Sequence, residues 1–354
     1  MSASLVGSEM CIRDRYSTFA AIDIGSYDVI LEIFEISKKQ GIRSVDKICH
    51  RMELGKDTYT LGKIRPEMEE ELCRVLADFV RIMEGYRVDD YRATASSAIS
   101  EASNSLYVLG KIHQLTGFSV TVLSNSEQRF LSYKALAAME DNFNKIIEKG
   151  TAILDLDGGS FQISLFDKDA LVTTQNIRMG SLRIRERLAG IQSETEHYEE
   201  MVEELIWNEV SSFKKMYLKD RKIENIMLIG DVFTDSVYQN IEEKTTKIIS
   251  RENFNTWYEK IIRQSPMELA VKLGIPLENA SLMYPSAVIY KCLIDMMGAE
   301  HIWIPGVHMT RGIAYEYAEQ MKLLKGGHNF ENDILMAAKN IGKRYAVNRP
   351  PVSY

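Results

Sequence analysis

The sequence contains one arrangement of strands and turns twice, and the two copies start at Asp23 and Asp155, 132 residues apart. In the first copy the run FAAIDIG leads through a glycine turn into YDVILEIFEIS; in the second, TAILDLDGGS leads into FQISLFDKDALVTTQNI. Alternation with period two is typical of half-buried strands. A unit of this size that recurs indicates a duplicated domain. The sequence therefore predicts an α/β fold with two similar domains, a boundary between residues 141 and 150, and a cleft between the domains.

Helices and further strands are expected after each hairpin. Pro66 suits the first turn of a helix, and the glutamates that follow it complement the helix dipole. In the first copy we expect a third strand at 43–54, helices at 66–86, 99–117 and 127–140, and strands at 91–96 and 118–124. In the second copy we expect helices at 195–218, 283–297 and 310–324 and a strand at 224–231.

Composition limits the classes of protein to which the chain can belong. Its 354 residues suffice for two domains, and 45% hydrophobic and 26% charged residues are ordinary values for a globular protein. A net charge of −7 argues against a nucleic-acid surface and against capture by an anionic membrane. No hydrophobic run approaches the ~20 residues of a membrane span. Four scattered cysteines favour a reducing cytoplasm over a disulfide framework or a cysteine metal site.

Each repeat places an aspartate at a strand end, followed by a glycine-bearing turn with a serine. Glycines let backbone N–H groups approach a phosphate, a serine hydroxyl can donate to the same oxygens, and an aspartate can hold a magnesium ion or its water shell. The alternative is an ordinary hairpin turn, which uses the same residue types, but two copies in a duplicated domain favour a phosphate clamp. The candidate phosphate-binding residues are Gly25, Ser26, Gly158, Gly159 and Ser160, and the candidate metal ligands are Asp23 and Asp155.

A third candidate lies in LSNSEQRF, where a strand is expected to end and a helix to begin. Ser126 suits the helix N-cap, which places Glu127 in the first turn at the rim of the sheet. A carboxylate there can act as a general base on water. The alternative is that Glu127 only complements the helix dipole, as acidic residues in first turns commonly do.

Two further glycine turns are candidates for phosphate binding. After the second hairpin, Gly180 precedes Arg183, whose guanidinium can pair bidentately with phosphate. Alternatively, Arg183 and its neighbours Arg178, Arg185 and Arg187 form a solvated helix face. The run LIGD places Gly230 after a strand and is the other candidate phosphate loop.

In this order and spacing, the motifs resemble the exopolyphosphatase / guanosine pentaphosphate phosphatase family, whose members have two actin-like, ribonuclease H-like domains. The resemblance runs from about Thr18 to Tyr345. It rests on AIDIGS, HRMELGKDTYTLGKI, SSAISEASN, VLSNSEQRF, ILDLDGGS, IRMGSLRIRERL and MYPSAVIYKCLIDMMGAE.

The resemblance implies a magnesium-assisted hydrolase that binds a phosphoanhydride chain in the cleft. By motif position, Glu127 activates water, Asp155 organises metal and water, and residues 158–160 with Arg183 bind phosphate. The implied domains are 16–145 and 146–328, and a homodimer is compatible with the resemblance. The substrate is expected to be inorganic polyphosphate or a guanosine polyphosphate.

The two ends of the chain stand apart from these domains. Residues 1–15 have no clear period and are interpreted as a non-native or disordered extension. Residues 332–348 are expected to form an amphipathic helix. It is either a terminal helix that docks on the body or, as the resemblance favours, the start of a truncated helical, HD-like domain spanning 329–354.

Several positions depart from the family pattern. Tyr27 and Asp28 replace small polar residues, and Ser100 stands where many members have a phosphate-binding arginine. Asp157 interrupts a loop that usually consists of glycines, and Gln162 stands where many members have a second acidic residue. These changes weaken the expected affinity for polyphosphate or the expected rate.

Three functions remain open. The first is a hydrolase that releases orthophosphate. The second is a catalytically degenerate member that binds a nucleotide, alarmone or polyphosphate as a sensor, which Ser100 and Asp157 favour. The third is an actin-like kinase that uses ATP, against which the absence of an adenosine-pocket motif argues.

Overall fold

The structure is a computed structural model that describes residues 16–139, 143–168, 170–189, 198–218, 221–230, 232–240 and 248–324, with a few positions between 332 and 342. The chain divides into two compact units. The first comprises residues 1–135 and 309–326, and the second comprises 136–308 and 327–354. The predicted extension at 1–15 lies outside the described residues, and so does most of the predicted helix at 332–348.

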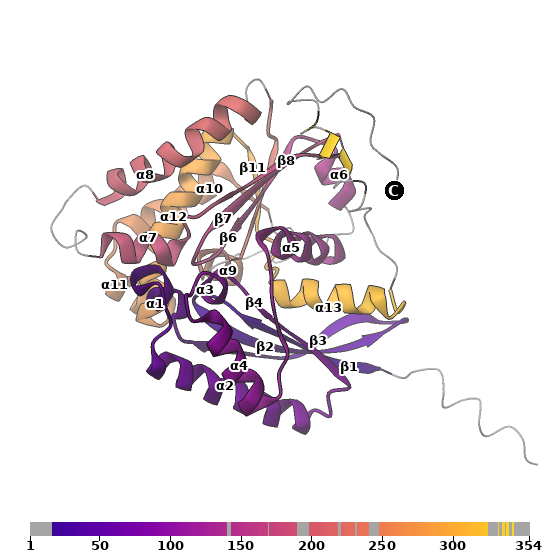
Figure 1. The fold of residues 1–354 in the computed structure, drawn as a ribbon. Helices are drawn as coiled ribbons and strands as arrows, with labels where there is room; N and C mark the ends of the chain where they lie inside the picture. The colour runs from indigo at the N-terminus through magenta and orange to yellow at the C-terminus, as the bar shows by residue number, and fades with distance from the viewer. Residues whose placement is uncertain are drawn as a thin grey trace, which may run out of the picture. The chain divides into compact units, whose positions relative to one another are not determined.

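The first unit contains a five-stranded mixed sheet with the order β3-β2-β1-β4-β5 (Figure 1). Its first three strands are antiparallel neighbours, as the sequence predicts, and β4 and β5 run parallel to β1. The strands are β1 (Ser17–Ile24), β2 (Asp28–Ser37), β3 (Gly41–Arg51), β4 (Asp90–Ala95) and β5 (Val120–Val122).

The alternating side chains of β1 divide between two hydrophobic layers, because successive residues of a strand point to opposite faces. Ala20 and Ile22 pack with α2 and α4, whereas Phe19 and Ala21 pack with α13 on the other face (Figure 1). The helices of this unit are α1 (Leu54–Leu61), α2 (Pro66–Gly85), α3 (Ser97–Ser100), α4 (Ser105–Thr116), α5 (Asn125–Met139, which runs into the second unit) and α13 (Met309–Gln320).

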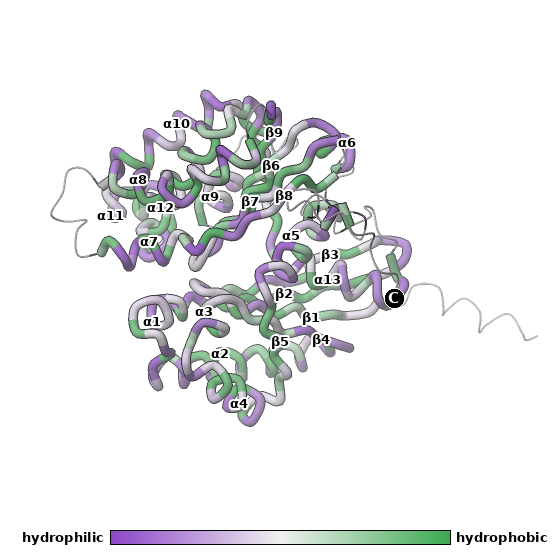
Figure 2. The backbone as a smooth tube through the Cα atoms, turned by 45° about the horizontal axis from the view of Figure 1, so that its top comes forward, coloured by the Kyte–Doolittle hydropathy of each residue, from purple (hydrophilic) through white to green (hydrophobic). Residues whose placement is uncertain are grey.

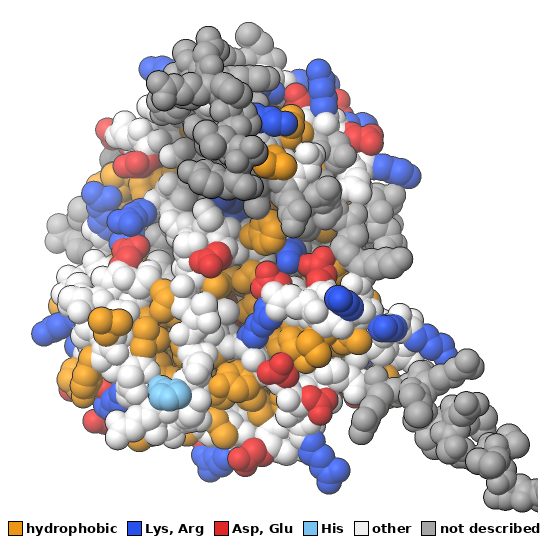
Figure 3. All heavy atoms as spheres, turned by 45° about the vertical axis from the view of Figure 1, so that its right-hand side comes forward, with side chains coloured by type: hydrophobic (Ala, Val, Ile, Leu, Met, Phe, Trp, Pro, Cys, Tyr) orange, Lys and Arg blue, Asp and Glu red, His pale blue; other side chains and the backbone are white. Residues whose placement is uncertain are grey.

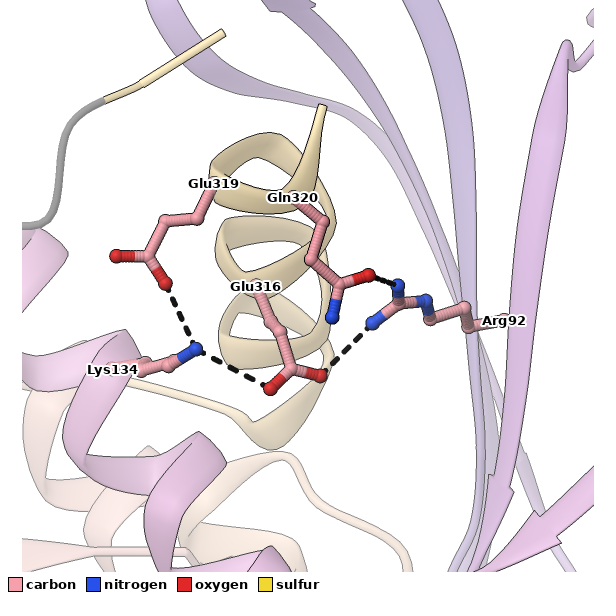
Figure 4. A network of polar contacts seen from close by, with 5 residues as sticks. All are labelled: Arg92, Lys134, Glu316, Glu319 and Gln320. Carbon is pink, nitrogen blue, oxygen red and sulfur yellow. Dashed lines mark hydrogen bonds and ion pairs between the residues drawn. The ribbon is translucent and has the colours of Figure 1, made fainter. Parts of the chain in front are cut away.

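Helix α13 corrects the domain assignment from the sequence, which placed residues 310–324 in the second domain. Its Tyr317 stacks on Phe19 of β1 with ring centroids 4.1 Å apart. A polar network fastens the same helix: Lys134 of α5 lies 3.3 Å from Glu316, whose other oxygen accepts from Arg92 of β4 at 2.9 Å (Figure 4). The chain therefore returns to the first sheet after the second unit. Likewise, the first unit gives way to the second at 135/136, within α5, instead of at the expected 145/146.

The second unit contains a six-stranded sheet with the order β10-β11-β9-β6-β7-β8. Strands β6, β7 and β8 are antiparallel neighbours, β9 and β11 continue parallel to β6, and β10 adds an antiparallel edge. The strands are β6 (Thr151–Leu156), β7 (Phe161–Asp167), β8 (Ala170–Ile177), β9 (Asn225–Ile229), β10 (Ile248–Ser250) and β11 (His301–Trp303). Three antiparallel strands followed by two parallel ones thus occur in both units, which confirms the duplication.

One continuous hydrophobic core joins this sheet to its helices, and green hydrophobic segments follow the strands in Figure 2. Ala152, Leu154 and Leu156 of β6 belong to this core together with residues of α8, α10 and α12. The helices are α6 (Phe143–Ile147), α7 (Ser181–Leu188), α8 (Tyr198–Phe213) with a π-helical extension (Lys214–Leu218), α9 (Val232–Asn240), α10 (Arg251–Ile262), α11 (Pro266–Leu273) and α12 (Leu277–Met297).

The surface carries both signs of charge. On the face shown in Figure 3, basic and acidic side chains are interspersed instead of forming separate fields. Within the described part of the chain, no helix is both long enough and apolar enough to cross a bilayer.

Candidate functional site

Each unit has a four-residue loop at the end of its first strand: residues 25–28, here called the first loop, and residues 157–160, the second loop. In both loops the first residue donates its N–H to the carbonyl oxygen of the fourth at 2.9 Å. Ser26 occupies the second loop position and Ser160 the fourth. The two serines that follow the glycines in the sequence are therefore not equivalent in the structure.

Three consecutive carbonyl groups of the second loop accept hydrogen bonds from the start of α7. The N–H of Ser181 donates to Asp157 at 3.3 Å, and the N–H of Arg183 donates to Gly158 at 2.9 Å. The Arg183 guanidinium adds a bond from Nε to the carbonyl of Gly159 at 2.9 Å. Helix α7 thus fixes the conformation of the loop that the sequence predicts to bind phosphate.

The close approach of α7 requires a glycine at its N-cap. A Cβ on Gly180 would lie 2.2 Å from the carbonyl oxygen of Asp157 and 2.4 Å from the carbonyl carbon of Gly158. In a planar trans peptide the N–H points opposite to the carbonyl. Because carbonyls 157–159 point at α7, the N–H groups of residues 158–160 point to the other side. Successive N–H groups on one side form an anion-binding concavity.

The first loop is held in the same way by residues 52 and 53 before α1 and by the first turn of α1. Gly55 donates its N–H to the carbonyl of Ser26 at 2.7 Å, and the carbonyl of Tyr27 accepts from residues 52 and 53. The hydroxyl of Ser26 lies inside the unit, with none of the residue exposed, 2.7 Å from Tyr59 Oη and 3.3 Å from Ser97 Oγ. Its role as a phosphate ligand stays a prediction, and in this conformation the hydroxyl bonds to neighbours inside the unit.

The two candidate metal-binding aspartates occupy the same place in the two sheets, one residue before the end of β1 and of β6. Asp23 is 9% exposed and has Thr94 Oγ1 at 3.5 Å. Asp155 is more exposed, and its Oδ1 would lie 2.7 Å from a Cβ on Gly230, which adopts φ +106°. Gly230 therefore lies against the carboxylate of Asp155 within the second unit.

An oxygen without a hydrogen-bond partner lies beside Asp155. Gln162 pairs with Asp155 across β6 and β7, is 5% exposed, and its buried Oε1 has no hydrogen-bond partner. Carboxylate and amide oxygens suit Mg²⁺, which keeps several water or phosphate ligands and needs only one or two from the protein. The residues present therefore fit a magnesium ion that shares its coordination with water and substrate. Among the described residues there is no larger cluster of histidine, cysteine and carboxylate side chains suited to a metal.

Glu127 lies in the first turn of α5, as predicted. The helix begins at Asn125, so its N-cap lies two residues before the predicted Ser126. Ser124 is the residue that caps it: both its N–H (2.8 Å) and its Oγ (2.7 Å) donate to Glu127 Oε2. These two bonds lower the pKa of Glu127, so the exposed carboxylate is ionised at neutral pH. Oε1 takes part in neither bond, and the side chain is exposed, so this oxygen is the one that could accept a proton if Glu127 acts as the predicted base.

A second helix in the same chain has the same cap. In α11, the N–H of Ser265 donates to Glu268 Oε2 at 2.8 Å and its Oγ donates at 2.9 Å, and the pKa of Glu268 is lowered by the same two bonds. The geometry of Glu127 is therefore that of a normal capping box. What distinguishes Glu127 is its place: α5 follows β5, which runs parallel to β1 in the first sheet, so it leaves the edge where the first loop lies.

Helix α13 fixes the position of α5. The backbones of the two helices touch, because a Cβ on Gly312 would lie 2.1 Å from the carbonyl oxygen of Leu131. Lys134, which is 8% exposed, lies 2.8 Å from Glu319 and 3.3 Å from Glu316 (Figure 4). The helix that carries Glu127 is therefore fastened by packing and by ion pairs.

Of the four arginines after β8, Arg178 and Arg187 are exposed, but the other two make contacts within the second unit. Arg183 binds the second loop, and Arg185 pairs with Glu186 at 2.7 Å and donates to Ser281 of α12 at 2.9 Å. The alternative of a solvated face is thus wrong for these two residues. Ser100 is exposed at the end of α3, and Asp231 of the LIGD run lies outside the described residues.

The structure brings the predicted residues together in two groups, one in each unit. Asp155, the second loop, Arg183 and Gly230 gather at the end of β6, while Asp23 and the first loop gather at the end of β1. The supporting hydroxyls of Tyr59, Ser97 and Ser124 were not predicted from the sequence. Only Ser124 had a signal, since a serine three residues before a glutamate marks a capping box.

Comparisons with known proteins agree with the fold. A family model described as the Ppx/GppA phosphatase family matches residues 32–321. The bifunctional 3-dehydroquinate synthase/phosphatase of Fusobacterium nucleatum is 21% identical over 321 residues, which is 82% of this chain and 46% of that protein. Exopolyphosphatase 1 of Mycobacterium leprae is 25% identical over 144 residues, 40% of this chain and 41% of that protein. The chain thus spans less than half the length of these two relatives.

Among solved structures, an exopolyphosphatase from Cytophaga hutchinsonii matches with a TM-score of 0.77 at 17% identity, over 86% of this chain and 98% of the other. At this identity the match concerns the fold. The fold is a duplicated arrangement of two mixed sheets with helices.

Proposed function

Because the chain belongs to the Ppx/GppA phosphatase family, we propose that it hydrolyses the terminal phosphoanhydride bond of inorganic polyphosphate or guanosine pentaphosphate and releases orthophosphate. The observation that carries the proposal is the second loop. Its three successive N–H groups point away from α7, and anions such as phosphate bind to backbone arranged in this way. A relative named exopolyphosphatase supports the substrate class.

In the proposed reaction, Glu127 accepts a proton from the attacking water through the carboxylate oxygen that Ser124 leaves open. The water oxygen forms a bond to the terminal phosphorus, the anhydride bond to the bridging oxygen breaks, and the shortened chain leaves with that electron pair. The second loop binds oxygens of the terminal phosphate and holds them while charge redistributes. Positioning and charge neutralisation supply most of the rate in such reactions.

A magnesium ion is part of the proposal. Asp155 and the buried Oε1 of Gln162 would hold it in the second unit. That Asp23, at the equivalent position of the first unit, is also a metal ligand stays a prediction. Bound there, it would neutralise charge on the phosphate oxygens. Gln162 contributes a neutral oxygen and cannot take a proton, so the proposed base is Glu127.

The alternative is a sensor that binds the same ligands without hydrolysing them. Asp157 in the second loop and the exposed Ser100 favour it, since one adds negative charge and the other lacks a cation for phosphate. A cytoplasmic location is proposed with either function, because Cys49, Cys73 and Cys292 are all thiols, as in a reducing compartment. A homodimer remains a prediction.

The proposal is tested by measuring orthophosphate release from long-chain polyphosphate and from guanosine pentaphosphate in parallel, with magnesium and with excess chelator. We expect magnesium-dependent release from one of the two substrates, which then identifies the ligand class. Binding of either substrate by calorimetry without any release would overturn the hydrolase and establish the sensor.

A further inference from the structure

The two loops differ at their first position, which is Gly25 in the first loop and Asp157 in the second. Both residues donate their N–H to the carbonyl of the fourth loop residue, so the backbone turn is shared. Asp157 adopts an ordinary backbone conformation, since it is not among the four described non-glycine residues with positive φ. The second loop therefore carries a carboxylate at this position and keeps the same backbone hydrogen bond as the first loop.

The added carboxylate binds the loop itself. Asp157 Oδ1 accepts the N–H of Gly158 at 2.6 Å. This N–H is the first of the three that point away from α7 and form the anion-binding side of the loop. A carboxylate oxygen and a phosphate oxygen accept hydrogen bonds from the same kind of donor, so both compete for it.

The loop cannot avoid the competition by moving toward α7. Its carbonyls are bonded to Ser181 and Arg183, and Gly180 already lies against the backbone of Asp157 and Gly158. Asp157 is only partly buried, so part of the residue borders solvent, into which a displaced side chain can turn. The side chain can therefore leave the donor while the backbone stays in place.

We propose that Asp157 is an internal competitor that occupies the phosphate-binding side of the second loop and lowers its affinity for every phosphate ligand. This inference rests on the proposed function, because it concerns the regulation of the same site. When Asp157 bonds to the Gly158 N–H, phosphate cannot bind there. The apparent affinity for phosphate is therefore the intrinsic affinity multiplied by the fraction of molecules in which this N–H is free of Asp157. The reduction applies to orthophosphate as well as to a phosphate chain, so the product is released more readily.

The test is calorimetric titration of the whole chain with orthophosphate and, separately, with tripolyphosphate, in buffer without divalent cations. Asp157→Ala removes the competitor, and Asp157→Asn keeps an oxygen that can accept from Gly158 but removes its charge. We expect Asp157→Ala to bind both anions at least tenfold more tightly than the wild type, with Asp157→Asn between them. Hydrogen bonds to charged groups are stronger than those to neutral ones, which sets this order.

Asp90 provides the matched control. Its Oδ1 accepts the N–H of the next residue, Tyr91, at 2.8 Å, as Asp157 does with Gly158, but at the start of β4. Asp90→Ala should leave both affinities unchanged. Equal or weaker binding by Asp157→Ala, with a wild-type unfolding midpoint, would overturn the inference. If phosphate release is observed but Asp157→Ala binds no more tightly, only the inference fails; if tightening occurs without release in any variant, only the hydrolase fails.

Discussion

The first and second loops have the same backbone hydrogen bond between their first and fourth residues, but they differ in their side chains. In both, the segment after the third strand of the hairpin donates N–H groups to loop carbonyls, Gly55 to Ser26 in one unit and Arg183 to Gly158 in the other. In the first loop the side chain at the second position is a buried serine bonded to Tyr59. In the second loop that position is a glycine.

The difference indicates how the two units have specialised. In the first loop, the Ser26 side chain bonds to Tyr59 of α1 and Ser97 of α3, so it stabilises the unit. The second loop is locked through its backbone by α7, and this arrangement leaves its N–H side directed outward. The second loop is therefore the better candidate for phosphate, and Asp157 is the residue that restrains it.

The largest expected effect comes from the glycine that precedes α7, and the equivalent residue before α1 gives a small comparison effect of opposite sign. Gly180→Ala forces a Cβ into backbone atoms 2.2–2.4 Å away, and we expect a loss of about 3 kcal/mol in the free energy of unfolding. At the corresponding N-cap of α1, Glu53 has φ 44°, so Glu53→Gly removes strain and should stabilise by about 0.5 kcal/mol. Urea unfolding measures both. If Gly180→Ala left the free energy of unfolding unchanged, α7 would not hold the second loop.

A smaller effect separates the two serines. Ser26→Ala removes a buried hydroxyl bonded to Tyr59 and Ser97 and should reduce stability by about 1 kcal/mol. Ser160→Ala should leave stability nearly unchanged and weaken tripolyphosphate binding by about fivefold, the loss of one hydrogen bond. Thermal unfolding and calorimetry distinguish the two outcomes. The reverse pattern would make the first loop the phosphate site.

The smallest effect is the pH dependence of the two capping boxes. The pKa values of Glu127 and Glu268 are lowered from 4.5 in the folded state. A lowered pKa stabilises the folded state above the unfolded pKa, and this contribution is lost as the pH falls through the folded value. Between pH 5 and pH 3 the wild type should therefore lose more stability than Glu127→Gln or Glu268→Gln. Identical acid titrations of all three would contradict the capping role.

Periodicity and turn chemistry predicted much of this fold. The alternating runs gave both hairpins correctly, and the spacing of Asp23 and Asp155 gave the duplication, because both features are local. The predicted single helix at 99–117 is wrong, because the chain forms α3 and α4 there, and α1 was not predicted. The third strand ends at Arg51, and the chain then turns at Glu53. Such turns are usually marked by a glycine or proline, and neither stands at this position, so the sequence carries no signal for the turn.

Sequence patterns identify the candidate residues but not the contacts that hold them, and the roles of these residues stay predictions. Asp155 and residues 158–160 were identified because glycines beside an aspartate have a known use. The role of Gly180 depends on an approach of α7 to a loop about 20 residues earlier, which no local pattern reports. The same holds for Gly312, which brings α13 onto α5, and for the return of α13 to the first unit.

The most direct test of the central claim compares two equivalent glutamates. Glutamine can keep the capping box at either position, so Glu127→Gln and Glu268→Gln should both fold with nearly wild-type stability. If Glu127 is the base, orthophosphate release should fall by ~10²-fold or more in Glu127→Gln and remain at the wild-type level in Glu268→Gln. Equal activity in the two variants would show that Glu127, like Glu268, does no more than cap its helix.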